Sequence, residues 1–513
     1  MIAKTRSAAI SGVDALRVDI EAHFQEADNE GMTLIVGLPD AAVKESRERV
    51  RSAITACGYR YPAGSTVINL APADLRKEGA IFDLPIALCV LAAAGMIPDD
   101  GRLEHILFAG ELALDGTVRP VKGILPVTLA ARSMKGEIQG IAVPEKNAEE
   151  AAVAAGDIPV YPIHSLMDAI RVLTGDALPL AKECGSYFAE PDWSGIPDFA
   201  EVKGQLAAKR ALEIAAAGGH NVLLSGPPGS GKSMLAKRLP GILPPMTEEE
   251  TLETSRIHSI LGLLPAGMPL LTTRPFRSPH HTVSDAGLLG GGTNPQPGEI
   301  SLAHNGVLFL DELPEFKRNV LEVLRQPLEN GNVSVCRAAG SFIFPARFIL
   351  VAAMNPCPCG HLGDTRHRCR CRALQVQQYR AKISGPLLDR IDMHIEVAAL
   401  SDEELTSAPT GETSAVIRER VLRAREIQQE RFRGCGITCN AHMEPVHLMR
   451  YCALDRQLQT LLRHSIVEFG FSARAYDKIL RVARTIADLA GSEEIRREHL
   501  FEAINYRSLD RRS

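Results

Sequence analysis

The sequence predicts an α/β protein with a parallel sheet at its centre and a helical region after it. Three short apolar runs bounded by turn residues are typical of buried parallel strands, namely Asn221–Leu224, Val307–Leu310 and Phe348–Ala352. A glycine-rich loop follows the first run, and an acidic pair follows the second. Residues 401–513 then show helical periodicity and high charge.

Four regions are expected along the 513 residues. Residues 1–175 mix β-like and apolar helical runs, which indicates an α/β or α+β unit. Residues 176–200 hold several prolines and glycines and the only Trp, as linkers do. Residues 201–400 alternate strands with helices, and residues 401–513 are expected to be helical.

Individual elements follow from periodicity and composition. Strands are expected at Val67–Ala71, Ile106–Ala113 and Gly140–Val143. Helices are expected at Leu84–Gly95, Leu125–Arg132, Val416–Gln429 and Ala475–Leu489.

Composition excludes several classes of protein. The net charge is −5, so any contact with nucleic acid must come from a local basic patch. The longest uncharged apolar stretch, Leu84–Pro98, is too short to span a bilayer, and no secretory signal is visible. The eleven cysteines favour thiols or metal ligands over disulfides. We therefore expect a cytoplasmic protein without membrane contact.

The glycine-rich loop matches G-x-x-x-x-G-K-[ST] between a strand and a helix, which predicts ATP binding. Its residues are Gly226, Pro227, Pro228, Gly229, Ser230, Gly231, Lys232 and Ser233. Backbone N–H groups of such a loop and the following helix N-terminus surround phosphate oxygens. Lys232 is expected to bind the β- and γ-phosphates, and Ser233 to bind Mg²⁺.

Polar residues follow the other two apolar runs. Asp311 and Glu312 end the second run, so they lie at the strand edge where open α/β sheets bind ligands. Asp311 is expected to hold Mg²⁺ through water, and Glu312 to act as general base. Asn355 follows the third run and either positions the attacking water or caps a turn before Pro356.

Two C-x-C pairs, Cys357/Cys359 and Cys369/Cys371, suggest a Zn²⁺ site. The pairs are tighter than usual, so His361 or His367 could replace one thiol, or all four could be reduced thiols in a loop. Basic residues of the same segment could bind phosphate backbones or form an ordinary solvated surface; they include Arg366, Arg368 and Arg370.

Two other groups are weaker candidates. The cluster of Cys435, Cys439 and His442 is discounted, and the His280–His281 pair is more typical of a turn than of a metal site.

Taken together, these motifs resemble the AAA+ superfamily, and in detail its magnesium-chelatase-like branch of ComM/YifB-type proteins. The specific stretches are Arg274–Thr282, Gly298–Gly306, Asn355–Gly360, Gly385–Asp392 and Ser472–Ala475. The resemblance implies a homo-hexameric ring with ATP at subunit interfaces. It also implies that Arg390 is an arginine finger and Arg474 a sensor arginine of a C-terminal helical lid.

The same resemblance implies two further elements of the ATPase core. An insert is expected around Ile257–Gly292, and a β-hairpin at Val333–Phe344. The hairpin would turn near Arg337, which either contacts DNA or is an exposed charge.

Residues 1–175 resemble a Lon-protease-type domain, with a ribosomal S5 domain 2-like α+β fold. Arg76–Asp83 lies where Lon carries its serine loop, but Ala80 and Ile81 leave no serine there, and the partner site offers no lysine. A Ser–Lys pair needs both groups, so no peptidase activity is expected.

The function that the resemblance implies is a DNA helicase or branch-migration translocase that acts in natural transformation and recombination. Its substrate would be single-stranded, forked or branched DNA. The alternative is a chelatase-like or protein-remodelling ATPase that acts on a partner protein. The D-x-S-x-S motif of a chelatase partner subunit is absent from the sequence.

Overall fold

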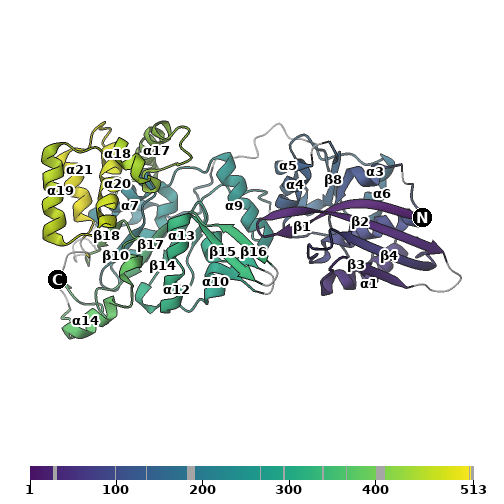
Figure 1. Cartoon of the computed structure of the whole chain (residues 1–513), viewed down its shortest axis with the longest axis horizontal. Helices are drawn as coiled ribbons and strands as arrows, with labels where there is room; N and C mark the ends of the chain where they lie inside the picture. The colour runs from purple at the N-terminus through teal and green to yellow at the C-terminus, as the bar shows by residue number, and fades with distance from the viewer. Residues whose placement is uncertain are drawn as a thin grey trace. The chain divides into compact units, whose positions relative to one another are not determined.

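The chain forms two compact units in the computed structural model (Figure 1). Unit 1 comprises Met1–Ala189 and Glu248–Leu271, and unit 2 comprises Glu190–Thr247 and Thr272–Ser513. The structure describes residues 1–26, 32–98, 100–134, 136–181, 191–265, 267–292, 295–337, 340–364, 367–399, 411–507 and 509.

Unit 1 is built on a mixed seven-stranded sheet in the order β3-β4-β2-β1-β5-β8-β9. Its strands are β1 (Ile2–Ser11), β2 (Asp14–Glu26), β3 (Thr33–Val36), β4 (Gly64–Ala71), β5 (Ile106–Phe108), β8 (Gly140–Pro144) and β9 (Val160–Ile163). β1 and β2 form a long antiparallel hairpin, whereas β5, β8 and β9 run parallel. The single strand expected at Ile106–Ala113 is wrong. After β5 the chain leaves the sheet, and β6 (Glu111–Leu112) pairs with β7 (Val118–Arg119).

Helices of unit 1 cover this sheet. They are α1 (Ala41–Ala56), α2 (Asp83–Ala93), α3 (Arg102–His105), α4 (Ile124–Ser133), α5 (Ala148–Ala155) and α6 (Leu166–Thr174). Every residue of α2 is buried, because the helix packs against β1, β2 and α1. A helix that is apolar on all sides needs such surroundings.

Helix α9 (Glu248–Leu261) also belongs to unit 1, although the sequence expectation places it in the central region. It packs against α4, and the N–H of Gly123, just before α4, donates to Ser259 O at 3.0 Å. Beyond it, Leu270 shares a small apolar cluster with Leu125 and Ala154. Apolar packing therefore groups this segment with the N-terminal residues.

Unit 2 contains a fully parallel five-stranded sheet in the order β11-β14-β17-β10-β18. Its strands are β10 (Val222–Ser225), β11 (Phe276–Arg277), β14 (Val307–Leu310), β17 (Ile349–Met354) and β18 (Met393–Glu396). This confirms the predicted parallel sheet. Because the strands are parallel, the segments that follow β10, β14 and β17 leave the sheet at the same edge.

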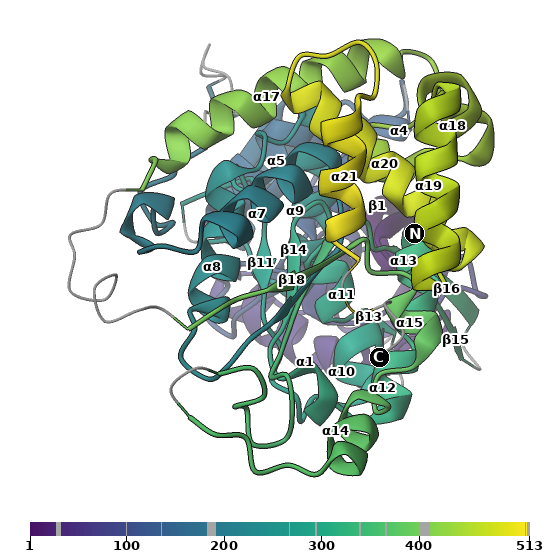
Figure 2. The ribbon, with the colours of Figure 1, turned by 90° about the vertical axis from the view of Figure 1, so that its left-hand side faces the viewer.

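Two further groups of elements complete unit 2. The elements that precede residue 400 are α7 (Leu206–Gly218), α8 (Lys232–Arg238), α10 (Asp285–Leu289), α11 (Glu299–Leu302), α12 (Arg318–Glu322), α13 (Arg325–Asn330), α14 (Ala373–Arg380), α15 (Gly385–Leu388) and the paired short strands β12 (Gly290–Gly291) and β13 (Gln296–Pro297). The C-terminal helices are α17 (Ser414–Arg431), α18 (Pro445–Tyr451), α19 (Arg456–Phe469), α20 (Ala473–Leu489) and α21 (Arg497–Asn505). Helix α7 packs against α17 and α20 (Figure 2), which joins the helical region to the sheet.

A β-hairpin of β15 (Asn332–Arg337) and β16 (Gly340–Pro345) lies where the sequence predicts one. Among the residues that the structure describes, no helix is both long enough and apolar enough to cross a bilayer.

Candidate active site

The phosphate loop joins β10 to α8, as its sequence predicts. Gly226 is required there, since a Cβ atom would lie 2.1 Å from Val397 O. Gly229 and Gly231 have positive φ angles of 75° and 91°, which favour glycine. These residues let the chain turn sharply into the N-terminus of α8, a position that favours bound anions.

Lys232 is the first residue of α8, and its side chain points back into the loop. Its Nζ donates to Gly226 O at 2.7 Å, to Pro227 O at 2.8 Å and to Asn355 Oδ1 at 3.3 Å. Burial lowers the pKa of Lys232, and the nearby carboxylate of Asp311 opposes that change. The ammonium group is thus held inside the turn of the loop.

The acidic pair lies beside the loop. Ser233 Oγ donates to Asp311 Oδ2 at 2.5 Å, and the Glu312 N–H donates to Asp311 Oδ1 at 2.9 Å. Glu312 itself has a φ angle of 52°, in the left-handed region that residues with side chains rarely adopt. The structure thereby brings Lys232, Ser233, Asp311 and Asn355 together at the carboxyl edge of the sheet.

His281 is a residue of this site that the sequence analysis missed. Its Nδ1 lies 3.3 Å from Glu312 Oε2, and its ring meets the Phe316 ring edge-on at 6.4 Å. His280 takes part in the expected turn, where its Nδ1 lies 2.9 Å from Thr282 Oγ1. The position of the His280–His281 pair is consistent with this, because the pair follows β11. That strand runs parallel beside β14, so both strands end at the same edge of the sheet.

Arg390 and Arg474 lie close to each other, but neither contacts Lys232, Ser233, Asp311 or Asn355. Arg390 forms an ion pair with Glu329, and Arg474 Nη2 lies 3.8 Å from Glu329 Oε1. Burial lowers the pKa of Arg390, while Glu329 opposes that change. All three residues line a cavity of about 550 Å³, together with Asp477, Lys478 and Arg481.

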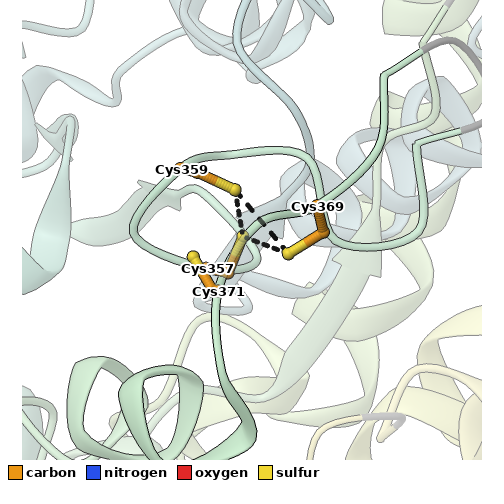
Figure 3. Close-up of side chains that lie close together, drawn as sticks. All are labelled: Cys357, Cys359, Cys369 and Cys371. Atoms are coloured by element: carbon orange, nitrogen blue, oxygen red, sulfur yellow. Dashed lines mark hydrogen bonds between the residues drawn. The ribbon is translucent and has the colours of Figure 1, made fainter.

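The four cysteines gather on one loop, with their sulfur atoms close together (Figure 3). Cys357 Sγ lies 3.4 Å from Cys359 Sγ and 3.7 Å from Cys369 Sγ, and Cys359 Sγ lies 3.6 Å from Cys369 Sγ. All four sulfurs, Cys371 included, lie within 4.8 Å of one another. Backbone N–H groups of Arg370 and His361 lower the pKa of Cys359 to about 6, which favours its thiolate.

Neither nearby histidine takes the place of a thiol. His361 Nδ1 and His367 Nδ1 each lie 3.1 Å from Asp364 Oδ2, and the three residues form a group of their own. The structure therefore separates an all-sulfur donor set from a His–Asp–His set on the same loop.

The basic residues of this segment divide into two kinds. Arg368 and Arg370 are exposed, whereas Lys382 pairs with Glu315 at 3.4 Å and Arg380 donates to Pro356 O. Arg366 lies outside the described residues, as does the side chain of Arg337, whose backbone ends β15 opposite Gly340. Two of the proposed DNA contacts are thus accessible side chains.

The discounted second cluster contains a buried pair. Cys439 Sγ lies 3.3 Å from His442 Nδ1, while Cys435 is exposed. Burial alone would raise the pKa of Cys439, but the facing His442 and Arg425 outweigh burial and lower it to about 6. The two side chains form a buried hydrogen-bonded pair of the helical region, and no third metal ligand joins them among the described residues.

The stretch that the sequence analysis compares with the Lon serine loop is packed. Ala80–Phe82 form a short 3₁₀ helix, η1, in which Ile81 and Phe82 are buried. The adjoining Asp83 accepts hydrogen bonds from Arg49 at 2.6 and 3.0 Å. Burial raises the pKa of Asp83, and Arg49 opposes that change. Asp83 and Arg49 fasten α2 to α1.

Comparisons with known proteins bear on the whole chain. Family models of magnesium chelatase subunit ChlI match residues 198–405 and 20–147, and a model of its C-terminal part matches residues 411–507. Competence protein ComM of Haemophilus influenzae is 47% identical over 98% of this chain and 97% of its own. The uncharacterized protein YifB of Salmonella typhimurium is 44% identical over 99% and 97%. The magnesium-chelatase 38 kDa subunit of Rhodobacter capsulatus is 25% identical over 59% of this chain and 84% of its own.

Proposed function

The chain belongs to the magnesium-chelatase-like family of ComM and YifB proteins, and we propose that it is a ring-forming AAA+ ATPase that moves along DNA. It would act as a helicase or branch-migration translocase in natural transformation and recombination. The observation that carries the ATPase is the set of hydrogen bonds from Lys232 to Asn355 and from Ser233 to Asp311.

Each residue at this edge has its own task in the proposed hydrolysis. Lys232 and the loop N–H groups bind phosphate oxygens. Ser233 would bind Mg²⁺ directly and Asp311 would hold it through water, and the ion would neutralise phosphate charge. Glu312 takes the proton of the attacking water, and Asn355 orients that water.

Arg390 and Arg474 act on the ATP of a neighbouring subunit in this proposal. The Asn221 side chain donates to Arg390 O at 3.3 Å, so Arg390 lies at the amino end of β10. The phosphate loop leaves the other end of that strand, roughly 13 Å away for four residues. Two arginines at the opposite edge suit a ring, in which each subunit completes the next one's site.

Support for DNA as the partner comes from two sources. The chain is 47% identical to a protein named for competence, and Arg368 and Arg370 are exposed on the cysteine loop. The hairpin of β15 and β16 adds a basic residue at its turn, Arg337. Contacts to phosphates through arginine predict binding that weakens steeply with salt and depends little on base sequence.

The alternative is a chelatase-like or protein-remodelling ATPase, which the similarity to the magnesium-chelatase 38 kDa subunit supports. The deciding experiment measures ATP hydrolysis by the full-length protein without DNA and with single-stranded, forked or duplex DNA. Glu312→Gln is the inactive control, since a general base contributes about 10²–10⁴-fold. Strong stimulation by forked DNA that is lost in the variant supports the DNA motor. Hydrolysis indifferent to every DNA form favours a protein partner.

We also propose that the outer regions have the roles that the resemblance implies. Residues 1–175 would be a Lon-protease-like domain without peptidase activity, since the serine position holds Ala80 and Ile81. Residues 401–513 would be the lid of the ATPase, and its helices α17 and α20 pack on α7 beside the sheet.

We propose that Cys357, Cys359, Cys369 and Cys371 are ligands of a zinc ion. A zinc–sulfur distance of about 2.3 Å gives tetrahedral sulfur–sulfur separations of about 3.8 Å, close to the 3.4–3.7 Å between three of these sulfurs. Elemental analysis of the wild type and of a variant with Cys369→Ser and Cys371→Ser tests the site. Equal zinc in both proteins would refute it.

A further inference from the structure

The cysteine loop touches the phosphate loop directly. Gly360, between the two C-x-C pairs, lies so close to Pro228 that an added Cβ would sit 2.6 Å from Pro228 Cδ and 2.8 Å from its Cγ. Pro228 is the third residue of the phosphate loop, and its ring is rigid. A shift of the cysteine loop at Gly360 therefore moves one wall of the nucleotide site.

A second connection runs through Asn355, which is separated from Cys357 by only Pro356. Cys357 is completely buried, and its carbonyl oxygen accepts from the Gly360 N–H at 2.9 Å. This turn carries two of the four thiols and the glycine that meets Pro228. The position of the Asn355 carboxamide, which accepts from Lys232, thus depends on the same turn.

The C-terminal end of the cysteine loop leads into a helix that contacts Asn355 and Pro356. Only Arg372 separates Cys371 from α14, whose Arg380 donates to Pro356 O at 3.4 Å. On the same helix, the Tyr379 hydroxyl accepts a hydrogen bond from the Asn355 backbone, while burial raises the pKa of Tyr379 to about 12. A metal that joins Cys357 and Cys359 to Cys369 and Cys371 would close this loop into a ring beside Asn355.

We propose that zinc in the four-cysteine site fixes a wall of the nucleotide pocket, so that zinc and nucleotide each strengthen the binding of the other. The inference rests on the proposed zinc and ATP sites. Its physical cause is that zinc restricts the conformations of the loop, and contact through Gly360 and Asn355 then restricts the phosphate loop and the water-orienting side chain. Coupling of this kind is reciprocal and amounts to about 5- to 150-fold in affinity.

Binding of fluorescent ADP to the full-length protein tests the coupling directly. We expect the Kd for ADP to rise at least about fivefold when zinc is removed by a chelator, and to recover when zinc alone is added back. In the reverse direction, ADP with Mg²⁺ should strengthen zinc retention against the chelator by the same factor. Lys232→Ala, which is expected to lose ADP binding, should show no such protection.

A matched pair of glycine substitutions separates the contact from the metal. Gly360→Ala keeps all four cysteines but places a methyl group against Pro228, whereas a Cβ at Gly363 would meet no atom within 4 Å. Both glycines have positive φ angles, 83° and 80°, so alanine strains the backbone similarly. With zinc content and melting temperature measured in each, Gly360→Ala should weaken ADP binding at least about fivefold more than Gly363→Ala.

Three outcomes are distinguishable. Equal ADP affinity with and without zinc, or in the two alanine variants, overturns the coupling. Absence of zinc from the purified wild type overturns the metal site on which the coupling rests. Absence of ADP binding by the zinc-loaded wild type overturns the phosphate-loop assignment instead.

Discussion

The carboxylate of Glu312 is held by two features of its immediate surroundings. Its backbone is left-handed, with φ 52°, a conformation that costs about 1–2 kcal/mol at a residue with a side chain. His281 Nδ1 lies 3.3 Å from its Oε2. Backbone strain of this kind persists where the surroundings determine it, and it is common at active sites. We infer that His281 positions Glu312, the proposed general base.

Replacing His281 should therefore slow hydrolysis without weakening ATP binding. For His281→Ala we expect kcat to fall about fivefold, on the order of 1 kcal/mol in the barrier, because Glu312 loses one restraint. KM for ATP should stay constant, since the ring contacts Glu312 and Phe316 rather than the phosphate loop. His281→Gln, which retains a donor, should recover part of kcat. His280→Ala is the control, and an equal loss in both alanine variants would contradict the positioning role.

Lys232→Ala should abolish tight nucleotide binding. The ammonium group makes charge-assisted hydrogen bonds, each worth about 1.5–3 kcal/mol, so affinity should fall about a hundredfold or more. Titration of full-length protein with fluorescent ADP measures this loss. Lys237 of the same helix provides a control, because Lys237→Ala leaves the loop intact. Tight binding by Lys232→Ala would remove the basis for the assignment.

Sequence motifs identify the residues of this site but not all of their partners. The phosphate loop and Asp311 belong to short contiguous patterns whose spacing encodes their chemistry. His281 and Glu329 do not, because each reaches its partner through the tertiary fold. The four thiols lie between these cases, since their spacing suggests a metal but only the folded loop separates them from His361 and His367.

At the scale of elements, a buried charged network fastens α20 to the parallel sheet. His220, just before β10, lies 3.8 Å from Asp392 and 2.8 Å from Thr485 of α20. Lys478 of the same helix forms an ion pair with Asp392. Burial would raise the pKa of Asp392, but Lys478 and His220 outweigh it and lower the value to about 2.

This network predicts loss of stability in mild acid. Burial lowers the pKa of His220 to about 4, and Lys478, Arg481 and Arg425 act in the same direction, while Asp392 opposes them. Between pH 6.5 and about 4 the unfolded chain therefore binds a proton that the folded chain does not, and stability falls as pH falls. The shift corresponds to about 3 kcal/mol.

Urea unfolding at pH 7 and pH 4.5 measures this effect. The wild-type midpoint should drop more than that of His220→Gln, which cannot titrate but keeps a hydrogen-bond donor towards Thr485. Identical pH dependence in the two proteins would show that His220 is not the titrating group.

The sequence predicted elements correctly where a local apolar pattern alone determines the helix or strand. Val307–Leu310 is β14 as expected, because an apolar run between turns has few alternatives. The assignment of α9 to unit 1 could not be predicted, because it depends on contacts of Ser259 with Gly123 and of Leu270 with Leu125. Contacts between residues more than a hundred positions apart leave no periodic trace in the sequence.

At the scale of the whole molecule, the arrangement of unit 2 bears on assembly. The proposed nucleotide-binding residues lie at the carboxyl edge of the sheet, and Arg390 lies at the amino end of β10. Arg390 and Arg474 share the carboxylate of Glu329 beside a cavity of about 550 Å³. Each subunit would then contribute its phosphate loop to one ATP site and its arginines to the ATP site of a neighbour. Hydrolysis would therefore require two subunits.

Mixing two inactive variants tests whether catalysis is shared. Glu312→Gln keeps Arg390 but cannot activate water, whereas Arg390→Ala keeps the phosphate loop but lacks the arginine. If Arg390 acts on the neighbouring subunit, a mixed ring contains interfaces where an intact loop meets an intact arginine, and ATP hydrolysis returns. Since an arginine of this kind contributes about 10³–10⁵-fold, even a few such interfaces raise the rate well above either variant alone.

The expected rate in the mixture depends on the proportions of the two variants. It should peak near equal amounts, where complementary neighbours are most frequent, and vanish at either extreme. Arg433→Ala, which removes a highly exposed arginine paired only with Glu430 among the described residues, serves as the control and should hydrolyse ATP at the wild-type rate. If mixtures that co-assemble by size-exclusion chromatography stay inactive at every ratio, Arg390 serves its own subunit or none. The proposed ring mechanism would then have to be abandoned, while the phosphate-loop assignment would stand.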